Sequence, residues 1–355
     1  MPTDAEVVMG WDIGGAHLKA VTLDGDGGVV RCVQSPCPLW QGLRHLEQGI
    51  ERIISGSSAT HHAVTMTGEL VDLFANRSEG VIAISDLAQK KLKEKAVMIF
   101  AGEKGFVSTE DCMNQTENIA SMNWYATGAL VASQVKQALL VDFGSTTTDI
   151  MLLSDGHVHA QGKNDFTRMA SEELVYTGLV RTPLMALAQK VSFQNTKIGL
   201  MAEYFATTAD VYRVLGELPE QADQHPAADN GDKTISDSAR RMARMIGRDV
   251  ETASQAEWRK LAQSFADIQT QILFKACERQ LARGVIGDDA PLIGAGCGSF
   301  LARKLAQKLR RNYFDFSSFV VGNLGAIKGV NTCAPAYSVA ALAYMEIYQH
   351  KMRHA

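Results

Sequence analysis

Residues 139–153 read LLVDFGSTTTDIMLL, which holds more hydrogen-bonding groups than a bend between two strands requires. Glycine lets a backbone approach an anion closely, and successive N–H groups in a turn bind phosphate oxygens. A carboxylate at a strand end can hold Mg²⁺, often through water. We predict a phosphate-binding turn with metal-binding carboxylates, and a polar hairpin without a ligand is the alternative. Its residues are Asp142, Gly144, Ser145, Thr146, Thr147 and Asp149.

Residues 11–20, WDIGGAHLKA, repeat this theme near the start of the chain. Asp12 is the second candidate metal ligand, and Lys19 lies on the outgoing strand. Taken alone this copy is weaker, because such Asp-x-Gly-Gly hairpins are common. The predicted phosphate-binding residues of this turn are Gly14, Gly15, His17 and Lys19.

A third glycine loop lies between an apolar strand and a helix, in PLIGAGCGSFLARKLAQKL. The free N–H groups at a helix N-terminus bind phosphate or a nucleotide base edge. The loop also resembles a dinucleotide-binding turn, but the remainder of the chain is too short for a doubly wound domain. Its candidate residues are Gly294, Gly296, Gly298 and Ser299.

Carboxylates elsewhere could serve as a catalytic base. Glu69 and Asp72 follow an apolar strand, and the alternative for Glu69 is that it opens the next helix near its positive end. On an expected helix, Glu203, Thr207 and Asp210 share one face; such a stripe either lines a cleft or is simply solvated. Arg181, after a Thr-Gly break, could bind phosphate.

A row of arginines at positions 240, 244 and 248 stands beside the segment Glu217–Asp237, which is rich in Pro, Asp and Gly and is predicted to be a mobile loop. The row could close over an anionic substrate, or it could be an exposed basic helix face.

Several elements must position these residues. Residues 7–34 and 137–162 each read as three short strands separated by glycine-containing turns. Two copies of one plan, about 130 residues apart, predict two similar domains facing one another across a cleft. Helical spacing is expected elsewhere, at 42–54, 126–135, 253–283 and 334–349, and the stretches 171–189 and 201–216 are expected to be rich in helix with Gly and Pro breaks.

Composition excludes several classes of protein. A net charge of -4 argues against a nucleic-acid partner. No apolar run is long enough to span a bilayer, and the first residues lack the pattern of a signal peptide, so a cytoplasmic location is expected. The cysteines form no CxxC pair and are expected to be reduced. Assembly into a homo-oligomer is left open.

The three glycine loops together resemble the actin/Hsp70/sugar-kinase superfold. With TMTGELVDLF (65–74), VYTGLVRTPL (175–184) and EYFATTADVYRVLG (203–216), the chain resembles the hydantoinase A/oxoprolinase-like family, and within it the tetrahydromethanopterin-linked C1-transfer branch. This implies an α/β fold with two similar domains, mixed sheets and a central cleft. We expect a first domain over 1–135 and a second over 136–355. The second would carry a helical insertion at about 165–285, and the final helix could return to the first.

The resemblance further implies a transferase of methanofuran-type cofactor synthesis. It would condense an aminomethylfuran-methyl diphosphate with the phenol of a (glutamyl)tyramine and release diphosphate, with Mg²⁺ as cofactor and without a need for ATP. Asp12, Asp142, Glu69, Asp72, Glu203 and Asp210 would be the catalytic candidates. An ATP-dependent hydantoinase or oxoprolinase-type hydrolase and a non-catalytic nucleotide-binding protein of the same pathway are the alternatives.

Overall fold

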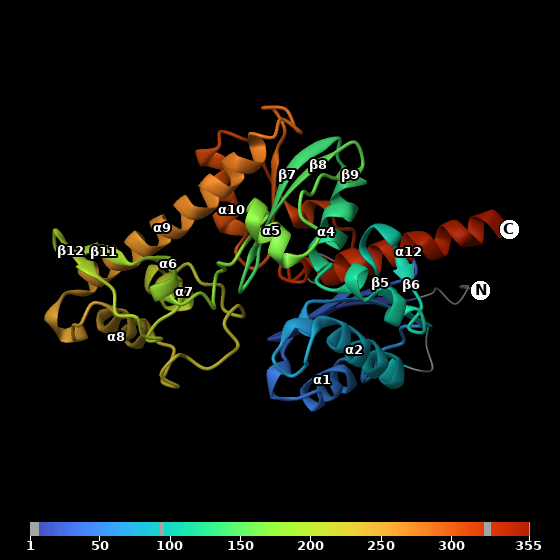
Figure 1. The fold of residues 1–355 in the computed structure, drawn as a ribbon, viewed down its shortest axis with the longest axis horizontal. Helices are drawn as coiled ribbons and strands as arrows, with labels where there is room; N and C mark the ends of the chain where they lie inside the picture. The colour runs from blue at the N-terminus through green and yellow to red at the C-terminus, as the bar shows by residue number, and fades with distance from the viewer. Residues whose placement is uncertain (1–6, 93–95, 323–327, 355) are drawn as a thin grey trace. The chain divides into compact units, whose positions relative to one another are not determined.

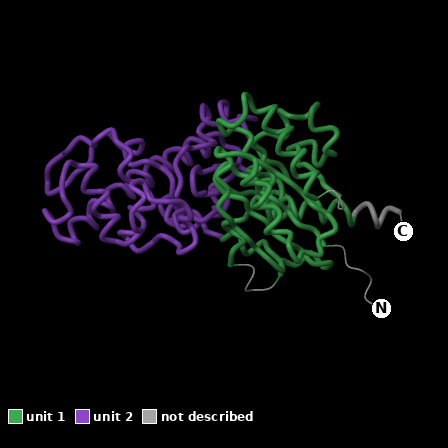
Figure 2. Tube along the Cα trace, turned by 90° about the horizontal axis from the view of Figure 1, so that it is seen from below, with its two compact units in different colours: residues 1–138, 153–159, 315–355 green, residues 139–152, 160–314 purple. Residues whose placement is uncertain are grey.

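The computed structural model describes residues 7–92, 96–322 and 328–354. The chain divides into two compact units (Figure 2). The first contains residues 1–138, 153–159 and 315–355, and the second contains residues 139–152 and 160–314. The segment carrying the last helix therefore belongs to the same unit as the first strand.

The first unit is built on a six-stranded sheet with the order β3-β2-β1-β4-β5-β6. Strand β1 is antiparallel to β2 and parallel to β4. The predicted glycine-containing turns join β1 to β2 and β2 to β3. Glycine permits the tight connection between β1 and β2. The strands are β1 (Val8–Ile13), β2 (His17–Leu23), β3 (Val29–Pro36), β4 (His61–Met66), β5 (Ala96–Phe100) and β6 (Phe106–Val107).

Helices cover both faces of this sheet (Figure 1). Trp11 lies in the core with Leu46 and Ile50 of α1 (Arg44–Ile54) and with residues of α2 (Arg77–Leu92). The opposite face meets α12 (Ala334–His354), where a Cβ on Gly10 would lie 2.0 Å from the carbonyl oxygen of Ala336. The unit also contains α3 (Thr116–Ile119), α4 (Asn123–Ala132) and short 3-10 turns, among them η2 (Gly68–Leu70).

The second sheet has the order β10-β8-β7-β13-β14, and β9 pairs with β8. Strand β7 of the second hairpin pairs with the parallel strand β13, as β1 of the first hairpin pairs with the parallel strand β4. This shared strand order establishes the predicted actin/Hsp70/sugar-kinase-like fold class. The strands are β7 (Gln137–Phe143), β8 (Thr148–Ser154), β9 (His157–Val158), β10 (Leu174–Val175), β13 (Leu292–Ala295) and β14 (Tyr313–Asp315).

Helices and one separate hairpin make up the rest of the second unit. Its largest element is α9 (Gln255–Leu281), whose Trp258 stacks on Phe193 of the hairpin. The remaining elements are α5 (Asp165–Ser171), α6 (Leu184–Leu187), β11 (Lys190–Phe193), β12 (Thr196–Gly199), α7 (Thr208–Leu215), α8 (Ile235–Met245) and α10 (Ser299–Lys308).

Two predicted helices are wrong in part. Residues 171–189 form the end of α5, strand β10, a turn and the short α6. Residues 201–207 are irregular, because Thr207 caps α7: Thr207 and Asp210 exchange side chain-to-backbone hydrogen bonds in a capping box. Thr and Asp favour this role at a helix start over a place inside a helix. Helix α8 likewise ends at Met245, so Arg248 does not continue the row of Arg240 and Arg244.

The segment 217–237 is held to the second unit at several points. Asp223 pairs with Arg213 and with Lys233, the latter at 3.2 Å. Asp229 pairs with the fully buried Arg241 at 3.0 Å. Arg240, of the row that could close over a substrate or form an exposed basic face, contacts Asp229 at 3.1 Å and Asp237 at 3.2 Å. These ion pairs tie Asp223, Asp229, Lys233 and Asp237 to the protein itself.

Candidate functional site

In the second unit, the predicted phosphate turn connects β7 to β8. Asp142 lies near the end of β7 and is 7% exposed. The N–H of Gly144 donates to the carbonyl of Thr147 at 2.9 Å, which closes the turn. The glycine and the three residues that follow are partly exposed, whereas the strands on both sides are buried. The turn therefore presents its N–H groups and hydroxyls at the end of a rigid hairpin.

A second loop, around Gly178, fixes the phosphate turn from one side. The backbone N–H groups of Leu179 and Val180 donate to the carbonyls of Gly144 and Ser145, each at 3.0 Å. A Cβ on Gly178 would lie 2.5 Å from the nitrogen of Thr146, so only glycine fits there. The guanidinium of Arg181 reaches the Thr146 hydroxyl at 3.4 Å. Arg181 and the turn, both predicted from sequence, are thus adjacent.

Sequence reasoning missed the network that supports Gly178. The amide of Gln269, on α9, donates to the carbonyl of Gly178 and to the hydroxyl of Thr177, both at 2.8 Å. The hydroxyl of Tyr212 donates to Gln269 at 2.6 Å. Burial raises the pKa of Tyr212 above its ordinary range, which keeps this hydroxyl protonated. These residues come from three distant segments, so no local pattern signals them.

The third glycine loop meets the same turn from the other side. Ala295 on β13 is the register partner of Asp142. The N–H of Gly298 donates to the carbonyl of Phe143 at 2.9 Å. Gly296 has a φ of +81°, and a Cβ there would lie 2.2 Å from the Phe143 carbonyl and 2.6 Å from Oδ1 of Asp142. The two predicted phosphate loops of this unit therefore form one continuous surface.

The turn in the first unit has the same geometry. The N–H of Gly14 donates to the carbonyl of His17 at 3.0 Å, as Gly144 does to Thr147. Asp12 is 3% exposed, and its Oδ2 lies 3.4 Å from Nζ of Lys19. His17 is buried, whereas Gly14 and Gly15 are partly exposed. Lys19 thus neutralises Asp12 from the neighbouring strand.

Thr65 lies beside Asp12 and was not predicted. Its register partner on β1 is Asp12, and it is fully buried. Within the described part of the chain, neither Oδ1 of Asp12 nor the Thr65 hydroxyl has a hydrogen-bond partner. One polar residue inside the apolar strand AVTM was the only sequence signal for it.

Glu69 and Asp72 have different surroundings. Glu69 lies in η2, is 1% exposed and accepts a hydrogen bond of 2.7 Å from the hydroxyl of Ser121. Ser121 itself has a φ of +54°, a region that non-glycine residues rarely adopt. Asp72 is exposed. The predicted pair is therefore one buried, oriented carboxylate and one solvated carboxylate.

The predicted stripe of Glu203, Thr207 and Asp210 does not exist as a helix face. Glu203 is exposed in an irregular segment ahead of α7. Asp210 is buried, accepts the N–H of Thr207 and contacts Arg241 at 2.9 Å. The stripe fails because α7 begins only after its N-cap Thr207, so Glu203 lies outside the helix. These contacts account for Asp210 as a stabilising residue of the helical part of the second unit.

No three His, Cys, Asp or Glu side chains within the described ranges are grouped to enclose a metal ion. Mg²⁺ binds through one or two carboxylates and keeps waters and phosphate oxygens as its other ligands, so the Asp at the end of each first hairpin strand fits it. Asp12, whose Oδ1 has no hydrogen-bond partner among the described residues, is the candidate to hold it in the first unit, and Asp142, beside Gly296, is the candidate in the second unit. Asp149 instead contacts Arg168 at 2.8 Å.

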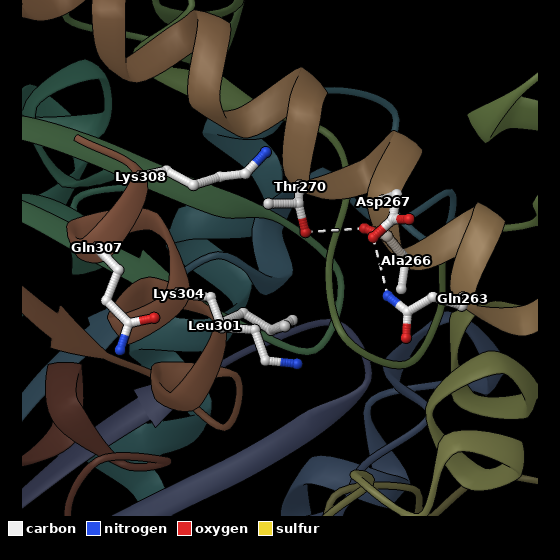
Figure 3. A pocket seen from close by; sticks show the side chains of 8 residues that line it. All are labelled: Gln263, Ala266, Asp267, Thr270, Leu301, Lys304, Gln307 and Lys308. Carbon is white, nitrogen blue, oxygen red and sulfur yellow. Dashed lines mark hydrogen bonds between the residues drawn. The ribbon is translucent and has the colours of Figure 1, made fainter. Parts of the chain in front are cut away.

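A groove of about 380 Å³ lies between α9 and α10 (Figure 3). Lys304, on its wall, also pairs with Glu217 at 2.8 Å, and Nζ of Lys308 lies 5.6 Å from the ring centre of Phe274. The groove contains none of the predicted site residues. Its lining consists of Gln263, Ala266, Asp267, Thr270, Leu301, Lys304, Gln307 and Lys308.

Two sheets of one strand order, each with an Asp and a glycine turn at the end of its first strand, define a protein of the actin/Hsp70/sugar-kinase class. The profile of the hydantoinase/oxoprolinase family matches residues 60–342. The chain belongs to this family. The matched range includes the second hairpin and the third glycine loop.

Two relatives carry the same name, (4-{4-[2-(gamma-L-glutamylamino)ethyl]phenoxymethyl}furan-2-yl)methanamine synthase. The protein of Methanocaldococcus jannaschii is 32% identical over 252 residues, which cover 71% of this chain and 74% of the relative. The protein of Methanococcus vannielii is 29% identical over 216 residues, which cover 60% of this chain and 93% of the relative.

Solved structures show weaker similarity. The activator of the 2-hydroxyisocaproyl-CoA dehydratase from Clostridium difficile, with bound ADPNP, has a TM-score of 0.45 at 12% identity, over 98% of this chain and 97% of that chain. Component A of the Acidaminococcus fermentans (R)-2-hydroxyglutaryl-CoA dehydratase has a TM-score of 0.47 at 8% identity, over 96% and 98%. No helix in the described ranges is long and apolar enough to cross a membrane.

Proposed function

We propose that this protein is an enzyme of methanofuran-type cofactor synthesis that forms an aryl ether between a furan-methyl donor and a phenol. The carrying observation is the identity of 32%, over 71% of the chain, with a synthase whose name describes a phenoxymethyl-furan methanamine. The phenoxymethyl group in that name is the ether link. The donor is an aminomethylfuran-methyl diphosphate, and the acceptor is a (glutamyl)tyramine.

The proposed reaction breaks the bond between the furan-methyl carbon and the diphosphate oxygen, whose electron pair leaves with the diphosphate. The phenol oxygen forms the new bond to this carbon and loses its proton to a base. Negative charge therefore accumulates on the leaving diphosphate in the transition state. Groups that meet this charge where it develops contribute most to the rate.

The turns described above supply such groups. The partly exposed Gly144–Thr147 turn offers backbone N–H groups and hydroxyls, and Arg181 adds a cation beside Thr146. The Gly178 loop and the Gly296 loop hold this turn from two sides, so little reorganisation is needed when charge develops. Mg²⁺ bound to Asp142 in the second unit, or to Asp12 in the first, would neutralise part of the diphosphate charge.

The phenol needs a base, because its ordinary pKa is about 10. Of the predicted carboxylates, Glu69 has the environment that suits the role best: it is buried and is oriented by the Ser121 hydroxyl. A base held in one orientation transfers a proton efficiently when the substrate lies within hydrogen-bond reach. Asp72 and Glu203, both exposed, are weaker candidates.

The matched family profile favours one rival, an ATP-dependent hydrolase of the hydantoinase or oxoprolinase type. Release of diphosphate from the furan-methyl diphosphate, with and without a tyramine-containing acceptor, tests the proposal beside release of phosphate from ATP. The transferase should release diphosphate only with the acceptor and should leave ATP intact. Steady phosphate release from ATP that ignores the acceptor would replace the proposal with the rival.

A further inference from the structure

Three polar side chains form a row across adjacent strands of the first unit. Asp12 on β1 has Lys19 on β2 as its antiparallel partner and Thr65 on β4 as its parallel partner. Register partners on neighbouring strands point to the same face of a sheet and lie about 4.8 Å apart. Gly10, two residues before Asp12, lies on the face that α12 covers, so the row shares this face.

The row contains two unexplained oxygen atoms. Lys19 contacts Oδ2 of Asp12, which leaves Oδ1 of Asp12 and the hydroxyl of Thr65 without a hydrogen-bond partner among the described residues. Asp12 is 3% exposed and Thr65 is 0% exposed, so bulk water does not reach them either. A buried polar atom without a partner costs about 1–3 kcal/mol, and proteins rarely keep one without a use for it.

The chemistry of these atoms restricts what could bind them. A carboxylate oxygen that is not protonated can only accept hydrogen bonds, so Oδ1 of Asp12 repels a phosphate oxygen. Deep burial restricts the ligand further to the size of a water molecule or a bare ion. A water molecule bound to a cation turns its lone pair toward the cation and donates both hydrogens. Two acceptors on neighbouring strands match that pattern of two donors.

We propose that Thr65 is a positioning residue for the metal: its hydroxyl and Oδ1 of Asp12 jointly accept hydrogen bonds from one water in the hydration shell of a bound divalent cation. The inference deepens the proposed function, since it rests on the Mg²⁺ assigned there. Lys19 holds the other carboxylate oxygen of Asp12, so the orientation of the carboxylate toward this water is fixed.

The test compares Thr65→Val, which keeps the shape and removes the hydroxyl, with Thr65→Ser, which keeps the hydroxyl. Thr127→Val is the control: Thr127 is equally buried in the same unit, but its hydroxyl donates to the carbonyl of Asn123 at 3.4 Å. Binding of Mn²⁺ alone to the full chain is measured by electron paramagnetic resonance. Thermal unfolding is measured without metal.

Thr65→Val should bind Mn²⁺ roughly tenfold more weakly, which is the effect of losing one hydrogen bond. Its Tm without metal should equal or exceed that of the wild type, because an unpartnered polar group has been removed from the interior. Thr65→Ser should bind Mn²⁺ as the wild type does, and Thr127→Val should not change Mn²⁺ binding.

Two results would overturn the inference. The first is unchanged Mn²⁺ affinity in Thr65→Val, or no Mn²⁺ binding by the wild type. The second is a lower metal-free Tm of Thr65→Val, since the hydroxyl would then have a partner in the protein. Neither result decides whether the protein is the proposed transferase, because diphosphate release with and without the acceptor is measured separately.

Discussion

The guanidinium of Arg168 lies 2.8 Å from the carboxylate of Asp149, and Arg168 is 1% exposed. Asp149, a predicted metal ligand, thus has a buried cationic partner in its own unit. Removing one member of a buried pair leaves the other charge uncompensated, which is strongly destabilising. This relationship separates the two carboxylates of the second hairpin into a structural residue and a ligand-facing residue.

We therefore predict that Asp149→Asn lowers the free energy of unfolding by about 3 kcal/mol in the absence of metal. Urea unfolding of the metal-free protein measures this. Asp288→Asn, at an exposed position in the same unit, should leave the unfolding curve unchanged. If Asp149→Asn also unfolds like the wild type, the ion pair does not stabilise the fold, and the predicted metal role gains support.

Asp142→Asn should instead lower the turnover of the enzyme and leave its stability nearly unchanged. The substitution keeps the shape and removes the charge that would hold Mg²⁺ at the diphosphate, so turnover should fall by about 10²-fold or more. The free energy of unfolding should change little, since the substitution keeps the shape of the side chain and a ligand-facing carboxylate is rarely a packing element. Turnover equal to that of the wild type would remove Asp142 from the site.

Gly178→Ala tests the loop that supports the phosphate turn. The new Cβ would lie 2.5 Å from the nitrogen of Thr146 and 2.6 Å from the carbonyl oxygen of Ser145, so the turn must shift. We expect weaker binding of diphosphate, measured by isothermal titration, together with a lower Tm. Gly199→Ala is the matched control, because nothing lies within 4 Å of a Cβ there. Equal diphosphate affinity in both variants would contradict the supporting role.

Glu257 makes part of the stability dependent on pH. Hydrogen bonds from the backbone N–H of Ser254, from the amide of Gln194 and from the Ser254 hydroxyl lower the pKa of Glu257 from 4.5 to about 2. Because the pKa is lower in the folded state, the contribution is complete above pH 4.5. It is lost as the pH falls from there toward 2.

The wild type should thus lose more Tm between pH 5 and about pH 2 than Glu257→Gln, which cannot titrate. Thermal scans over this range measure the difference. At pH 7 the variant should have the lower Tm, because it lacks the charged acceptor at the start of α9. Parallel Tm curves for the two proteins would show that these hydrogen bonds do not stabilise the folded state.

Local chemistry made part of the site predictable. Asp12 and Asp142 both precede glycine turns between apolar strands, and that pattern alone identifies a hairpin and the polar groups at its end. The capping box of Thr207 and Asp210 was also present in the sequence, but the helical spacing of the neighbouring residues was given more weight, and the prediction failed there.

Other parts depend on contacts between distant segments. Gly178 matters because it meets Thr146, and its supporter Gln269 lies 91 residues further along the chain. Thr65 looks like an ordinary strand residue until its register with Asp12 is known. Neither relationship leaves a periodic or compositional pattern, because both arise from tertiary packing.

The contact of Gly10 with Ala336 and Ala340 has a consequence for biosynthesis. Because β1 is synthesised before the second unit and α12 after it, the part of the sheet face that α12 covers stays open while the second unit is being made. Contacts of such long sequence separation slow folding and leave apolar surface open to aggregation. Val8 and Val21, which lie on this face, therefore remain open to aggregation in the nascent chain until α12 has been synthesised.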